Sequence, residues 1–98
     1  MYPNNLNDEF GRINLLYTGN VQGVGFRFSF ERIASELGVT GFVKNLPDGK
    51  VEAVCEGPKK SLDVLVNRVA ERMSGHISSC RVNGGDFSGE FNDFTILS

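Results

Sequence analysis

A glycine-rich segment followed by an arginine is the part of the chain whose residue types are best suited to chemistry. Residues 19–25 read Gly-Asn-Val-Gln-Gly-Val-Gly, and Phe26 and Arg27 follow directly. Glycines let backbone N–H groups converge on an anion without obstruction by a Cβ atom, and the start of a helix adds partial positive charge. The guanidinium of Arg27 can bind two phosphate oxygens at once. This pattern predicts a phosphate site, although such a loop is often only a tight turn, and Arg27 could instead pair with Glu31.

The elements that must position this loop follow from the spacing of apolar residues. Helical spacing predicts one helix from Phe26 that stops at Gly38, and a second that begins at Pro58 and is closed by Gly75. Short apolar or alternating segments predict strands, the second and third of which form a hairpin. The predicted strands are residues 13–18, 40–44, 51–56, 77–82 and 94–97, and turns are expected at 46–49, 83–85 and 88–89.

This order predicts an α+β, ferredoxin-like split β-α-β sandwich, βαββαβ plus a short C-terminal strand. Its two helices cover one face of a mostly antiparallel sheet. In this arrangement the first two strands run the same way, with the third between them. Residues 19–27 and Asn45, at the end of the second strand, therefore lie at the same end of the sheet, about 10 Å apart. The side chain of Asn45 can thus reach a small anion held by the loop, although an Asn before Pro47 is also typical of an ordinary turn.

Composition narrows the classes of protein that fit. A length of 98 residues with 40% hydrophobic residues suits one globular domain, expected at 12–98 after a mobile polar tail at 1–11. The net charge of −2 argues against a general nucleic-acid binder. No apolar run approaches the roughly 20 residues of a membrane span, and the first residues do not resemble a secretion signal, so a cytoplasmic location is expected.

The cysteines and the histidine offer little for a metal site or a disulfide. Cys55 and Cys80 fall on strands that flank the first strand, about 10 Å apart, so both are expected to be reduced, small apolar fillers. The lone His76, expected in an exposed loop, has no metal-ligating residue at helical spacing. These residues therefore leave little room for a metal site.

Two separate segments resemble the signatures of the acylphosphatase family. Residues 19–27 are similar to its glycine-loop signature. Residues 41–51, Gly-Phe-Val-Lys-Asn-Leu-Pro-Asp-Gly-Lys-Val, continuing to Gly57, are similar to its second signature. The spacing between the two agrees as well, and the resemblance covers about Ile13 to the C-terminus. It implies a small enzyme on a ferredoxin-like fold that hydrolyses carboxyl-phosphate anhydrides without metal or cofactor.

The resemblance also implies roles for individual residues. Arg27 matches the family's phosphate-binding arginine, and Asn45 matches the asparagine that positions the attacking water. Asn20 stands where members commonly have Arg, and Phe30 where many have Thr, which puts a surface charge and a hydroxyl contact in doubt. The backbone amides that match the phosphate cradle are those of Gln22, Gly23, Val24, Gly25 and Phe26.

The implied substrate, an acyl phosphate, suits this set of residues. Its carboxylate leaving group departs without protonation, so charge stabilisation and positioning are what remains for the protein. Loop amides and Arg27 would hold the phosphate oxygens, and Asn45 can orient a water without being a strong base. The expected partners are a small-molecule acyl phosphate, or inorganic phosphate or sulfate as a site ligand. No nucleic acid or membrane is expected, and the protein is expected to be a monomer.

Three other functions compete with hydrolysis. The first is an anion-binding or regulatory module of the same fold that has lost turnover. The presence of Arg27 and Asn45 argues against it. The second is an RNA-recognition domain, which shares the element order but stacks bases on aromatic residues that are lacking at residues 51–56. The third is the carbamoyl-phosphate-handling domain of a larger maturation enzyme. The sequence to Ser98 shows no second domain, so free-standing hydrolysis is the expected function.

Overall fold

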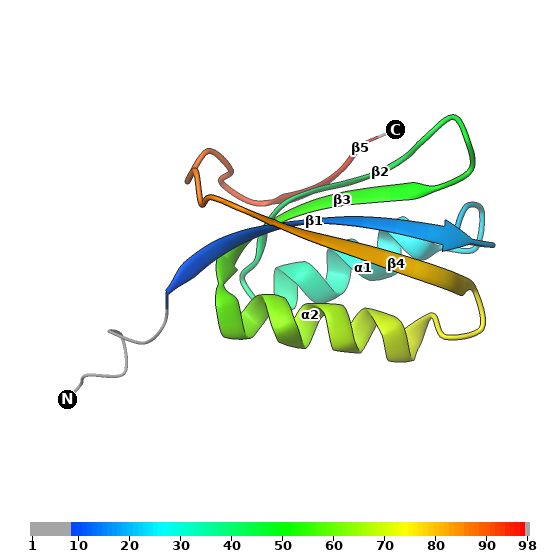
Figure 1. The fold of residues 1–98 in the computed structure, drawn as a ribbon, viewed down its shortest axis with the longest axis horizontal. Coiled ribbons are helices and arrows are strands. Elements are labelled where there is room, and N and C mark those ends of the chain that lie inside the picture. Colours follow the sequence, from blue (N-terminus) through cyan, green and yellow to red (C-terminus); the bar gives the residue numbers. More distant parts are fainter. Residues whose placement is uncertain (1–8, 98) are drawn as a thin grey trace.

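Five strands and two helices form a two-layer structure in the computed structural model, which describes residues 9–97. The strand order is β4-β1-β3-β2-β5, and only β5 runs parallel to its neighbour, β2. Both helices cover one face of the sheet (Figure 1), as expected for a ferredoxin-like fold, and β3 lies between β1 and β2 as predicted. Neither helix in this part of the chain is long and apolar enough to cross a membrane. The elements are β1 (Phe10–Gly19), α1 (Phe26–Glu36), β2 (Thr40–Asn45), β3 (Val51–Pro58), α2 (Lys59–Arg72), β4 (Ile77–Gly85) and β5 (Phe94–Leu97).

Strand pairing extends three elements beyond the bounds that local sequence predicts. β1 begins at Phe10, so the last two residues of the expected tail, 10 and 11, belong to the sheet; residues 1–8 of that tail lie outside the described residues. β4 runs through the expected turn at 83–85, and β3 runs on to Pro58. The cause is that the first half of β1 pairs with both segments, and ladder hydrogen bonds outweigh the turn preference of the residues involved.

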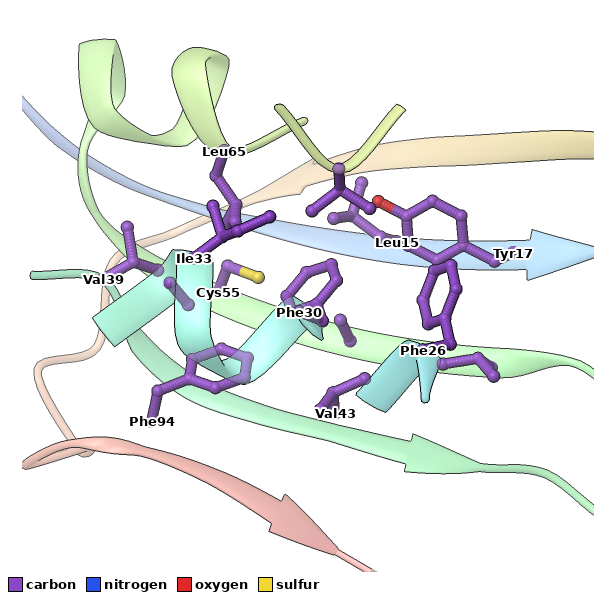
Figure 2. Packing of buried hydrophobic residues seen from close by; sticks show 14 of the residues in the cluster. Leu15, Tyr17, Phe26, Phe30, Ile33, Val39, Val43, Cys55, Leu65 and Phe94 are labelled. Atoms are coloured by element: carbon purple, nitrogen blue, oxygen red, sulfur yellow. The ribbon is translucent and has the colours of Figure 1, made fainter. Parts of the chain in front are cut away.

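Aromatic packing fixes the start of α1 against the sheet. The rings of Tyr17 and Phe26 meet edge to face with centroids 4.9 Å apart, and Phe30 stacks on Phe94 at 5.5 Å (Figure 2). All four side chains are buried, and Phe30 has no exposed surface. Because Phe26 is the first residue of α1, this packing also fixes the end of the glycine loop.

The cysteines and the histidine are placed partly as expected. Cys55 and Cys80 are free and lie on the two strands that flank β1. Cys55 is buried, and burial raises the pKa of its thiol to about 12, so it is not a nucleophile at neutral pH. The expectation that Cys80 is a small apolar filler is wrong, because its side chain is exposed on the edge strand β4. His76 is half-buried rather than exposed, because its turn packs against Gly19.

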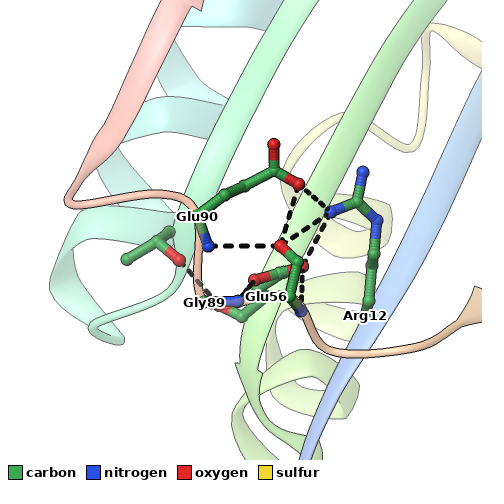
Figure 3. Close-up of polar contacts among 6 residues, drawn as sticks. Arg12, Glu56, Gly89 and Glu90 are labelled. Atoms are coloured by element: carbon green, nitrogen blue, oxygen red, sulfur yellow. Dashed lines mark hydrogen bonds and ion pairs between the residues drawn. The ribbon is translucent and has the colours of Figure 1, made fainter.

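A buried carboxylate holds the connection that crosses the sheet from β4 to β5. Glu56, with no exposed surface, accepts hydrogen bonds from Arg12 Nη1 at 2.7 Å and from the backbone N–H of Ser88 and of Gly89, each at 3.0 Å (Figure 3). The Ser88 hydroxyl donates a further bond at 2.8 Å. Burial by itself raises the pKa of Glu56, but these hydrogen bonds outweigh it and lower the pKa from 4.5 to about 2.

The Glu56 carboxylate should therefore stabilise the fold in a pH-dependent way. A lowered pKa in the folded state means that the stabilisation is complete above pH 4.5 and is lost as the pH falls towards about 2. We expect Glu56→Gln to lower the free energy of unfolding by about 1.5–3 kcal/mol at pH 7, with the difference from wild type shrinking between pH 4.5 and about 2. Urea unfolding at several pH values measures this. Glu36→Gln, which breaks an exposed ion pair with Arg68, is the control and should cost under about 1 kcal/mol; equal losses in the two variants at pH 7 would contradict the assignment.

Candidate active site

The glycine loop lies at the end of the sheet where β1 stops and α1 begins. The turn between β2 and β3 lies at the same end (Figure 1). Gly23 and Gly25 have φ angles of 77° and 76°, in the left-handed region that favours glycine. In the described part of the chain, the amides of residues 22–26 donate no hydrogen bond to another protein group. Gly25 caps α1 without a side-chain bond, so the helix start and these amides are free to face an anion.

The loop borders a hollow of about 180 Å³ that brings the predicted site residues together. Arg27 and Asn45 both line it, as do two of the loop glycines and Phe26. Gln22 and Val24, which were expected in the cradle through their backbone amides, are not among its lining residues. The lining consists of Val21, Gly23, Gly25, Phe26, Arg27, Phe28, Asn45 and Ile96.

Arg27 is held by the last strand rather than by its own helix. Its Nη1 donates to the backbone carbonyl of Leu97 at 2.8 Å. Glu31, the partner considered from sequence, instead accepts a hydrogen bond from Ser35. The guanidinium has five N–H donors in a rigid fork. One bond to β5 therefore orients the group and leaves the remaining donors available to a ligand.

Asn45 ends β2 and is one of the residues that line the hollow. Its backbone pairs with Val51 across the hairpin, and the turn proper follows it, closed by a bond from the Gly49 N–H to the Leu46 carbonyl. Its Oδ1 atom is buried and accepts no hydrogen bond from the described residues. Buried polar atoms are nearly always paired. The side-chain amide of Asn45 therefore retains hydrogen-bonding capacity at a residue that lines the hollow.

Gln22 connects the two halves of the site through its side chain, which sequence reasoning did not anticipate. Its Nε2 donates to the backbone carbonyls of Leu46 at 2.8 Å and Lys50 at 2.9 Å. Leu46 directly follows Asn45, so these bonds tie the glycine loop to the segment that carries Asn45. No sequence signal would have found this contact, because both acceptors are backbone atoms.

The two departures from the family pattern lie away from the hollow. Asn20 is exposed at the start of the loop, and neither it nor Phe30 lines the hollow. Phe30 is in the core, so it offers no polar contact to a ligand. Residues 9–97 contain no group of three or more His, Cys, Asp or Glu side chains placed to hold a metal ion.

Comparison with known proteins shows the family. The family model described as acylphosphatase matches residues 13–96. The chain belongs to the acylphosphatase family. The chain is 42% identical over 87 residues to the acylphosphatase of Methylococcus capsulatus, covering 88% of this chain and 95% of that one.

Solved structures agree with the fold. The crystal structure of acylphosphatase from Bacillus subtilis superposes with a TM-score of 0.81 at 27% identity, covering 92% of this chain and all of that one. The structure of HypF from T. kodakarensis has a TM-score of 0.78 at 28% identity, with 90% of this chain matching only 12% of that protein. A domain of similar fold therefore also occurs as a small part of a much larger protein.

Proposed function

We propose that this acylphosphatase hydrolyses the carboxyl-phosphate bond of small acyl phosphates with Arg27 and Asn45 as its catalytic residues. The observation that carries the proposal is that one hollow is lined by Arg27, by two glycines of the loop and by Asn45, whose Oδ1 is buried and unpaired. A phosphate group fits the cationic side and the helix start. An attacking water fits the Asn45 amide, which both donates and accepts hydrogen bonds.

The reaction balances without a side-chain acid or base. The water oxygen forms a bond to phosphorus as the bond from phosphorus to the acyl oxygen breaks, and that electron pair leaves with the carboxylate. One water proton passes to a phosphate oxygen, so R–CO–O–PO₃²⁻ and H₂O give R–COO⁻ and H₂PO₄⁻. The amides of residues 22–26 and Arg27 stabilise the charge on the transferring group, while Asn45 holds the water in line.

The location and assembly of the enzyme form a further part of the proposal. Two free cysteines, Cys55 and Cys80, suit a reducing compartment, so we place the protein in the cytoplasm. Arg27 and Asn45 come to one hollow within a single chain, so we propose that the protein acts as a monomer. Its partner is then the small-molecule substrate alone, with inorganic phosphate or sulfate competing for the cradle.

Release of phosphate from acetyl phosphate tests the proposed function. We expect turnover by the wild-type protein that is unchanged by a chelator, because Arg27 and the loop amides supply the positive charge. Far-ultraviolet circular dichroism of the same sample checks that it is folded. A folded protein that binds inorganic phosphate but releases none from acetyl phosphate would instead be an anion-binding module of this fold. Loss of turnover on chelation would overturn the metal-free mechanism.

A further inference from the structure

Two large apolar side chains at the hollow are left exposed to solvent. Phe28 is 59% exposed and Ile96 is 41% exposed, yet both line the hollow that holds Arg27 and Asn45. Apolar side chains that remain exposed around a site of this kind commonly mark a binding surface. Neither side chain has a polar group that could hold phosphate or water.

The backbone places both residues beside Arg27 or its hydrogen-bond partner. Phe28 follows Arg27 on α1, and Ile96 precedes Leu97, whose carbonyl accepts the bond from Arg27 Nη1 at 2.8 Å. The hydrogen bond that orients the guanidinium therefore also joins α1 to β5 at this point. One apolar residue from α1 and one from β5 thus lie beside the proposed phosphate site.

We propose that Phe28 and Ile96 form a subsite for the acyl group, which favours aryl and branched alkyl acyl phosphates over acetyl phosphate. This inference rests on the proposed function. The loop amides and Arg27 take the phosphate, so the group R of R–CO–O–PO₃²⁻ has to point away from them, towards the rest of the lining. Among the described residues that line the hollow, Arg27 alone is charged. A charged R group finds no partner there, whereas an apolar one covers the exposed ring and the isoleucine.

The ratio of kcat/KM for benzoyl phosphate to kcat/KM for acetyl phosphate measures this preference. We expect Phe28→Ala to lower the ratio by about five- to tenfold, the change expected when an aromatic ring loses an apolar neighbour. Ile96→Ala should lower it by about threefold, and Phe28→Leu should fall between wild type and Phe28→Ala. Partial unfolding affects both substrates equally, so it cancels in the ratio.

Two exposed apolar residues remote from the hollow supply matched controls. Phe10→Ala removes a ring that is 55% exposed, and Val64→Ala shortens a side chain that is 43% exposed; neither should change the ratio. Active Phe28→Ala and Ile96→Ala variants with the wild-type ratio would overturn the acyl subsite while leaving the proposed function intact. A wild-type protein that hydrolyses neither substrate would overturn both.

Discussion

Replacing Arg27 by alanine is expected to lower kcat/KM for acetyl phosphate by about 10²–10³-fold, the typical cost of removing a donor that stabilises transition-state charge. The same variant should bind inorganic phosphate more weakly, because the guanidinium contacts the ground-state anion as well. The chain has no Trp, so intrinsic tryptophan fluorescence is not available as a signal. Phosphate release measures the rate, and calorimetry measures phosphate binding.

A lysine at this position separates charge from geometry. Arg27→Lys keeps the positive charge but loses the planar pair of donors, and with it the bond geometry that β5 imposes through Leu97. We expect its rate to lie between those of wild type and Arg27→Ala. Arg32→Ala, an exposed arginine on the same helix that does not line the hollow, is the matched control. A rate for Arg27→Ala within threefold of the control would remove Arg27 from the mechanism.

The arrangement of the fold follows from features that the sequence carries locally. The apolar periodicity changes at Phe26 and ends at Gly38, which is sufficient to predict α1 and the return to the sheet. Local sequence does not predict how far the strands extend when they pair with one another. Asn83, Gly84 and Gly85 have turn preferences, but all three pair with the first half of β1, and only the assembled sheet provides that partner.

The candidate site also has one part that the sequence predicts and one part that it does not. Glycines, an arginine and an asparagine have distinctive side chains or backbones, so their spacing predicts a phosphate site at one end of the sheet. The groups that hold them in place are the carbonyls of Leu97, Leu46 and Lys50. Every residue type has a backbone carbonyl, so no pattern of residues marks the particular ones that orient Arg27 or anchor Gln22.

Replacing Asn45 by alanine is expected to separate catalysis from binding. The variant should lower kcat for acetyl phosphate by about 10²-fold or more, because the water loses the amide that orients it. KM and the affinity for inorganic phosphate should change far less, because Arg27 and the loop amides remain. Steady-state kinetics together with calorimetric phosphate binding measure both effects, and Asn67→Ala, an exposed asparagine on α2, is the control.

Asn45→Asp distinguishes a positioning amide from a general base. A carboxylate at this position keeps the size of the side chain and would activate a water if a base were limiting, raising the rate as the pH increases through its titration. It also removes the N–H donors and places a negative charge beside the phosphate. We therefore expect Asn45→Asp to be no more active than Asn45→Ala at neutral pH. Activity in Asn45→Asp near the wild-type level would show that the reaction uses a base, and that the phosphate oxygen is not the proton acceptor.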